Sequence, residues 1–135
     1  MNTLKQSIKR HEGFRLYPYM DTTGNLTIGW GRNLTSKGIN SDEAELMLLN
    51  DIITAKEDYV RLPISVRSNC NFKRKDVLVE MVFQLGFVGV LKFKKMFAAL
   101  ERRDFTRAAD EMKDSLWYRQ TPSRATELAD RMKKG

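Results

Sequence analysis

The chain has 135 residues, of which 41% are apolar and 30% are charged, a composition that excludes disordered and collagen-like proteins. The formal net charge of +7 predicts attraction to polyanions such as nucleic acid, anionic lipid or acidic wall polymers, and charge alone does not choose among them. Cys70 is the only cysteine, which excludes an intramolecular disulfide and favours a semi-buried structural thiol.

The N-terminal segment predicts a short helix that ends with an acid. Leu4 and Ile8 form an apolar stripe at helical spacing, and Gly13 is placed to stop the helix. Glu12 therefore lies in the last turn, where the helix dipole disfavours a second negative charge. This position suits Glu12 to the role of a general acid.

Residues 14–34 predict a β-hairpin. Two β-prone stretches, Arg15 to Tyr19 and Leu26 to Trp30, flank a polar turn that begins at Asp21. Taken alone, Asp21 is best explained as a residue that hydrogen-bonds the turn backbone. Two carboxylates on different elements also suit cleavage of a glycosidic bond, in which one keeps its proton and the other stays ionised. The hydroxyl of Thr27 follows on the next strand.

The remainder of the chain predicts helices. Ser41 is expected to cap a helix of about twenty residues, roughly 30 Å long, which can join a small β-containing lobe to a second lobe. A strongly apolar helix follows from Val77 to Leu85 and stops at Gly86. Three more helices are expected, from about Val90 to Glu101, from Asp104 to about Met112 and from Pro122 onward.

Four blocks in order resemble the T4-type phage lysozymes of glycoside hydrolase family 24. The first contains Glu12, Asp21 and Thr27, which fit the family spacing of Glu, eight residues, Asp, five residues and Thr. That block continues through Gly29-Trp30-Gly31. The other three blocks are Asp42 to Glu45, Met81 to Gly86 and Trp117 to Ala125.

The resemblance implies hydrolysis of the β-1,4 bond between N-acetylmuramic acid and N-acetylglucosamine in peptidoglycan, without a cofactor or metal. Glu12 would protonate the leaving oxygen, Asp21 would activate or position a water, and Thr27 would orient that water. Inversion at the anomeric carbon would follow, with roughly 6.5 to 9.5 Å between the two carboxyl groups. The alternatives are a lytic transglycosylase acting on the same bond and a catalytically silent wall-binding module.

The resemblance also assigns roles outside this trio. Arg124 is expected to orient Glu12, with a surface arginine at a helix start as the alternative. Phe83 is expected to line the saccharide cleft, with core packing as the alternative. Asn33 is expected to bind a sugar or to cap a turn. Arg32 departs from the best-known members, which carry histidine there.

The expected fold is therefore α+β and lysozyme-like, a single domain over residues 1–135. A small N-terminal β-hairpin lobe of about residues 13–60 would be joined by the long helix to a larger all-helical lobe. The helical lobe would comprise about residues 1–12 and 61–135. The short connection from Gly31 to Asp42 implies that part of the small lobe of longer relatives is missing.

The expected partner is peptidoglycan, with electrostatic attraction to the anionic cell envelope. We expect no nucleic-acid binding, because the chain has no recognisable motif for it, and a monomeric state. The N-terminal segment lacks the apolar core of a signal peptide, and no run is long enough for a membrane span. We therefore expect synthesis in a host cytoplasm, no stable membrane insertion, and release to the wall through a holin-type membrane lesion.

Overall fold

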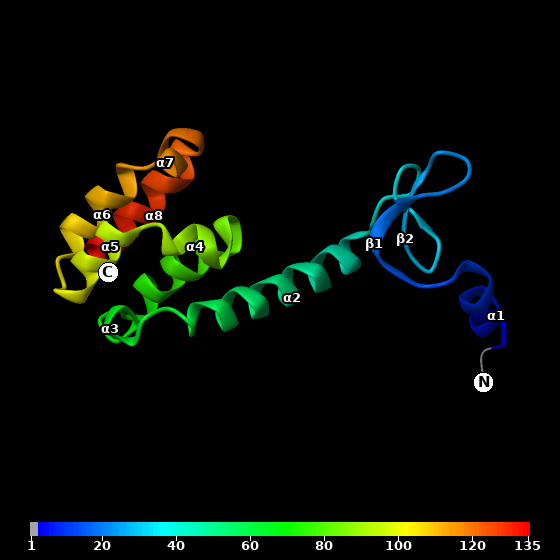
Figure 1. The fold of residues 1–135 in the computed structure, drawn as a ribbon, viewed down its shortest axis with the longest axis horizontal. Helices are drawn as coiled ribbons and strands as arrows, with labels where there is room; N and C mark the ends of the chain where they lie inside the picture. The colour runs from blue at the N-terminus through cyan, green and yellow to red at the C-terminus, as the bar shows by residue number, and fades with distance from the viewer. Residues whose placement is uncertain (1–2) are drawn as a thin grey trace. The chain divides into compact units, whose positions relative to one another are not determined.

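The computed structural model describes residues 3–135 and divides the chain into two compact units, which we call unit 1, Met1–Met47, and unit 2, Leu48–Gly135 (Figure 1). In its described residues, unit 1 contains one complete helix, a three-stranded antiparallel sheet of order β1-β2-β3 and the first residues of a long second helix. Its elements are α1, Thr3–Glu12; β1, Arg15–Met20; β2, Leu26–Gly29; and β3, Arg32–Asn33. The expected short helix and hairpin are confirmed.

Local backbone chemistry explains where α1 and the hairpin end. The N–H of Gly13 donates to the carbonyl of Lys9 at 3.0 Å, and the positive φ of Gly13, +73°, closes α1 directly after Glu12. The pairing of β1 with β2 is irregular between Arg15 and Tyr19. Pro18 lies within this interval, and it has no N–H to donate to a neighbouring strand.

The long helix α2, Ser41–Tyr59, begins in unit 1 with a capping box. The side-chain oxygen of Asn40 accepts a hydrogen bond from the N–H of Glu43 at 2.9 Å, and a carboxylate oxygen of Glu43 accepts one from the N–H of Asn40 at 2.9 Å. The expectation that Ser41 caps this helix is therefore wrong. Asn and Ser are both common residues at a helix N-cap, but only Asn40, and not Ser41, has an acidic residue three positions later.

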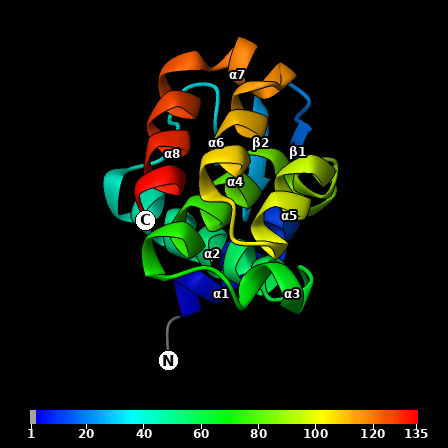
Figure 2. The same cartoon turned by 90° about the vertical axis from the view of Figure 1, so that its left-hand side faces the viewer.

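Unit 2 is helical and contains the buried apolar core, which is drawn from residues 55–132. Figure 2 shows α6 and α8 side by side, and both contribute fully buried methionines, Met112 and Met132. Methionine packing in the core is confirmed for Met81 and Met96 as well. The helices are α3, Ile64–Arg67; α4, Phe72–Leu91; α5, Lys94–Glu101; α6, Phe105–Lys113; α7, Leu116–Gln120; and α8, Pro122–Lys134.

Two helix boundaries in unit 2 have clear causes. Gly86 leaves the helical region, with φ +78° and ψ 165°, so α4 kinks where the sequence predicts a stop. The single helix expected from Val90 to Glu101 is interrupted before α5 at Lys94. Phe93 lies in this break and packs edge-on against Trp117, with ring centroids 6.0 Å apart.

The end of α8 is held by Arg74, near the start of α4. Its Nε donates to the carbonyl of Met132 at 2.7 Å and its Nη2 to the carbonyl of Lys133 at 3.1 Å. The guanidinium also lies 3.4 Å from the ring centroid of Phe105, at the start of α6. One arginine therefore links three helices of unit 2.

Cys70 follows α3 and is half-buried, as expected for a structural thiol. Burial raises the pKa of the thiol above its usual value, which favours the less reactive protonated form.

The structure confirms an α+β fold in which helices dominate and a small sheet lies in the N-terminal region. The assignment of residues 1–12 to the helical lobe stays a prediction. Within residues 3–135, no helix combines the length and the apolar character that crossing a bilayer requires.

Candidate active site

The Glu12 carboxylate lies against the α-carbon of Gly31, in the short turn between β2 and β3. A β-carbon added to Gly31 would come within 2.6 Å of Oε2 of Glu12 and 2.7 Å of its carboxyl carbon. Gly31 also has a φ of +76°, which side-chain-bearing residues rarely adopt. A side chain at this position would displace the Glu12 carboxylate and strain the backbone, so glycine is the residue that lets the acid approach the sheet.

Asp21 is fixed in the hairpin turn by three hydrogen bonds to one oxygen. Its Oδ1 accepts from the N–H of Thr23 at 2.9 Å, from the hydroxyl of Thr23 at 2.9 Å and from the N–H of Asn25 at 2.8 Å. The bond from the Asn25 backbone, supported by those from Thr23, lowers the pKa of Asp21 against the opposing effect of burial. Asp21 is therefore ionised at neutral pH, and its second oxygen, Oδ2, takes part in none of these three bonds.

Thr27 lies in β2 and is buried, at 4% exposed. Its hydroxyl donates to the carbonyl of Asn25 at 3.1 Å. Asn25 thus connects the two candidate residues, because its N–H binds Asp21 and its carbonyl binds Thr27. Since the Thr27 proton is used in this bond, its oxygen is oriented to accept a hydrogen bond from another group.

Asn33 pairs with Thr27 across β2 and β3. Its Oδ1 accepts from the N–H of Ser36 at 3.0 Å, which is the turn-capping contact that the sequence allowed. This contact uses the carbonyl oxygen of the side chain, whereas a sugar hydroxyl could accept from its amide nitrogen. Sugar binding by Asn33 stays a prediction.

The last two predicted residues belong to unit 2. Phe83, on α4, is 40% exposed and lines a shallow pocket together with Asp51 and Thr54. Arg124, near the start of α8, donates from Nε to a carboxylate oxygen of Glu80 at 2.9 Å. Phe83 is thus available to a ligand, and Arg124 is ion-paired within its own unit. Its proposed action on the catalytic acid stays a prediction.

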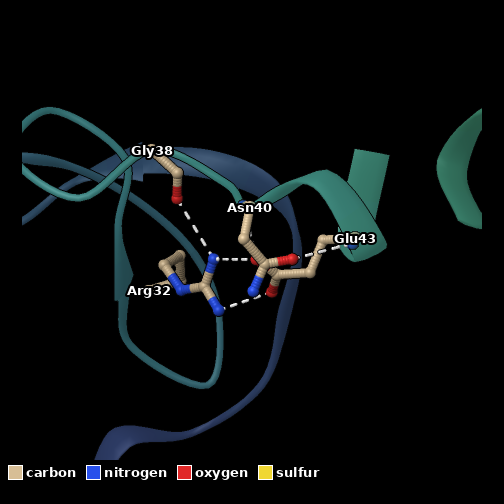
Figure 3. A network of polar contacts seen from close by, with 4 residues as sticks. All are labelled: Arg32, Gly38, Asn40 and Glu43. Atoms are coloured by element: carbon tan, nitrogen blue, oxygen red, sulfur yellow. Dashed lines mark hydrogen bonds and ion pairs between the residues drawn. The ribbon is translucent and has the colours of Figure 1, made fainter. Parts of the chain in front are cut away.

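Arg32, which stands where the best-known members of the resembled family carry histidine, has a structural role, which Figure 3 shows. Arg32 donates from Nη1 and Nη2 to the two carboxylate oxygens of Glu43, at 2.7 and 2.5 Å, and from Nη1 to the carbonyl of Gly38 at 3.1 Å. Glu43 also accepts the N–H of Asn40 in the capping box. This network joins β3 to the first turn of α2, directly beside Gly31.

The sequence does not single out Asn25 or Glu43 as functional residues, and it marks Gly31 only as part of the family-like block, without a role of its own. Asn25 looks like an ordinary turn residue, and Glu43 like an acid favoured near a helix start. The structure shows that Asn25 binds Asp21, that Gly31 lies next to Glu12 and that Glu43 binds Arg32.

A carboxyl group at a helix end and an ionised carboxylate in a hairpin turn are the pair of groups that glycoside hydrolases use. Comparison with known proteins agrees. The family model described as phage lysozyme matches residues 9–134. The chain belongs to the phage lysozyme family, as the sequence resemblance predicted, and it is a lysozyme, a glycoside hydrolase that lyses peptidoglycan.

Two relatives come from Dictyostelium discoideum. Probable T4-type lysozyme 2 is 31% identical over 157 residues, which cover 95% of this chain and 92% of the relative. Probable T4-type lysozyme 1 is 30% identical over 156 residues, with the same coverage of 95% and 92%. Both alignments are longer than the 135-residue chain, so these relatives carry additional internal residues.

A third relative is the pre-baseplate central spike protein Gp5 of Enterobacteria phage T4. It is 29% identical over 153 residues, which cover 93% of this chain but 27% of that protein. The similarity therefore concerns one part of a much longer chain.

The close approach of Glu12 to Gly31 yields a first prediction. The substitution Gly31→Ala should lower the rate of wall lysis by about tenfold or more, because the added methyl displaces the Glu12 carboxylate and small misplacements of reacting groups are costly. The rate is measured by the loss of turbidity of permeabilised bacteria. Gly29→Ala is the matched control, since Gly29 has a φ of +69° and no atom within 4 Å of an added β-carbon. Equal losses in both variants would show that backbone strain, not displacement of Glu12, is responsible.

The ion pair with Arg32 yields a second prediction. Hydrogen bonding by Arg32 is the largest cause that lowers the pKa of Glu43 from 4.5 to about 2. The contribution of this ion pair to the free energy of unfolding should therefore be complete above pH 4.5 and should disappear as the pH falls toward 2. Thermal melts should show a lower Tm for Glu43→Gln than for the wild type at pH 6, and the difference should narrow between pH 4.5 and pH 2. A difference that is independent of pH would contradict this assignment.

Proposed function

We propose that this lysozyme hydrolyses the β-1,4 bond between N-acetylmuramic acid and N-acetylglucosamine, with inversion at the anomeric carbon. Glu12 is the general acid, Asp21 the base that activates the water, and Thr27 the residue that orients it. The observation that carries the proposal is the hydrogen-bonded turn at Asp21, which keeps one carboxylate ionised through bonds to its Oδ1. The second carboxyl group, at the end of α1, is built into the same unit.

The proposed reaction needs no group beyond these side chains, the sugar and one water. Glu12 donates its proton to the glycosidic oxygen, and the bond from that oxygen to the anomeric carbon breaks. The water oxygen bonds to the anomeric carbon from the opposite face, while Asp21 accepts the proton that the water loses. Thr27 holds the water by accepting a hydrogen bond from it. Proton exchange with solvent then restores both carboxyl groups to their starting states.

Three residues are proposed to assist. Phe83 offers a partly exposed ring that can pack on a saccharide, and Asn33 offers its side-chain N–H₂ to a sugar oxygen. Arg124 is proposed to orient Glu12, and its contact with Glu80 through Nε leaves its terminal guanidinium nitrogens for a second carboxylate.

The setting of the reaction follows from charge and from the family. The net charge of +7 favours approach to anionic wall polymers, lipopolysaccharide or lipid headgroups, and added salt should weaken this attraction. We propose that the chain acts as a monomer. We also propose that it is made in a host cytoplasm and reaches the wall through a membrane lesion formed by another protein.

The assignment of the acid yields a third prediction. Glu12→Gln should abolish lysis of outer-membrane-permeabilised bacteria, because the substitution removes the transferable proton at nearly constant shape. The variant should keep the wild-type circular dichroism spectrum and Tm. Cys70→Ser is the control and should lyse at the wild-type rate, since the thiol is a structural group. A fully active Glu12→Gln protein would refute the assignment of the acid.

The stereochemistry yields a fourth prediction. Proton NMR of early products should show the α-anomer at the new reducing end, because a water that attacks opposite the leaving group inverts the β-linkage. Mass spectrometry of the same digest should show hydrated ends. Retained β-anomer would argue for a covalent intermediate, and anhydromuramic ends would identify a lytic transglycosylase.

A further inference from the structure

Trp30 makes two ring contacts with residues that flank Glu12 in the chain. Phe14 stacks on it with ring centroids 4.4 Å apart and an angle of 20° between the ring planes. From the other flank, the ammonium of Lys9 lies 4.2 Å from the centroid of the Trp30 ring. The stacked pair and the cation each fall within the range of favourable aromatic contacts.

The positions of these contacts in the chain are informative. Lys9 lies three residues before Glu12 in the last turn of α1, and Phe14 lies two residues after it. Trp30 directly precedes Gly31, where an added β-carbon would meet the Glu12 carboxylate. The indole ring thus contacts residues on both sides of Glu12 in the chain, and Trp30 is the residue next to Gly31, against which the Glu12 carboxylate lies.

The segment after Glu12 needs such a restraint. Gly13 joins α1 to β1 with a φ of +73°, and no atom lies within 4 Å of a β-carbon placed there. A glycine in open space is the least restricted joint that a chain can have. The contacts of Trp30 with Lys9 and Phe14 span this joint, so they limit rotation of the helix end relative to the sheet.

We propose that Trp30 is a positioning residue for the reaction, which holds the end of α1 so that the Glu12 carboxylate stays against Gly31. This proposal rests on the proposed function, in which Glu12 is the general acid. Trp30 acts through Glu12 and does not itself exchange a proton.

Because Trp30 lies outside the apolar core, its effect on the position of Glu12 can be distinguished from an effect on the stability of that core. Trp30 is 43% exposed, and the buried apolar core of the described chain is drawn from residues 55–132 in unit 2. Removal of the indole therefore leaves that core intact. Removal of the indole should nevertheless lower the catalytic rate strongly, because catalysis is sensitive to displacements of a reacting group by about 1 Å.

The test compares Trp30→Ala and Trp30→Phe with the wild type on soluble, uncross-linked peptidoglycan strands. Trp30→Ala should lower kcat by about tenfold or more while KM stays within about twofold, because the acid is misplaced and substrate binding is not. Trp30→Phe should recover kcat to within about threefold of the wild type, since a phenyl ring still stacks on Phe14 and accepts the Lys9 cation. Tyr17→Ala, which removes an aromatic side chain of β1 that is 83% exposed, is the matched control and should leave both constants unchanged.

Several outcomes would overturn the proposal. An unchanged kcat in Trp30→Ala would do so, as would an equal loss in Tyr17→Ala or a failure of Trp30→Phe to recover kcat. A raised KM with unchanged kcat would identify Trp30 as a residue that stacks on the sugar instead.

Two more variants keep the result interpretable. Lys9→Met keeps both rings and the length of the side chain but removes the cation, so it should fold even if Trp30→Ala does not. It should lower kcat by about two- to tenfold, and an unchanged kcat would oppose the proposal. Glu12→Gln is assayed beside them. If it is active, the proposed function fails; if it is inactive while Trp30→Ala keeps its full kcat, only the positioning role fails.

Discussion

The ion pair between Arg32 and Glu43 is the interaction on which unit 1 depends. The described apolar core lies in residues 55–132, so the three-stranded sheet near the N-terminus relies on polar and aromatic contacts of its own. Arg32 binds both carboxylate oxygens of Glu43, and Glu43 at the same time caps α2. Because Gly31 adjoins Arg32, the bridge also fixes the backbone against which Glu12 lies. A loss of this pair would therefore affect both the helix start and the acid.

The turn of the hairpin combines structural and chemical roles in the same atoms. One oxygen of Asp21 satisfies the turn, and this hydrogen bonding is what keeps the carboxylate ionised. Asn25 extends the arrangement to the hydroxyl of Thr27. The sequence allowed two interpretations of Asp21, as a turn residue and as a catalytic residue. They are compatible, because the hydrogen bonds of the turn keep the carboxylate in the ionised form that a base requires.

The sequence predicts those features that depend on neighbours in the chain. Helical periodicity and stop signals locate α1, the hairpin and most helices of unit 2, and the resemblance to the family spacing identifies Glu12, Asp21 and Thr27 as candidates. Contacts between distant residues are not encoded in such patterns. The approach of Glu12 to Gly31 and the pair of Arg124 with Glu80, which are 44 positions apart, required the fold. Even a local error, Ser41 in place of Asn40 as the cap of α2, arose because two adjacent residues share the capping chemistry.

The arginine that ties together the helices of unit 2 also restricts which residue can follow α8. Gly135 has a φ of +74°, and a β-carbon placed there would come within 2.5 Å of the Arg74 guanidinium. A side chain at this position would therefore push Arg74 away from the carbonyls of Met132 and Lys133. The last turn of α8 would then lose the two donors that satisfy its free carbonyl groups.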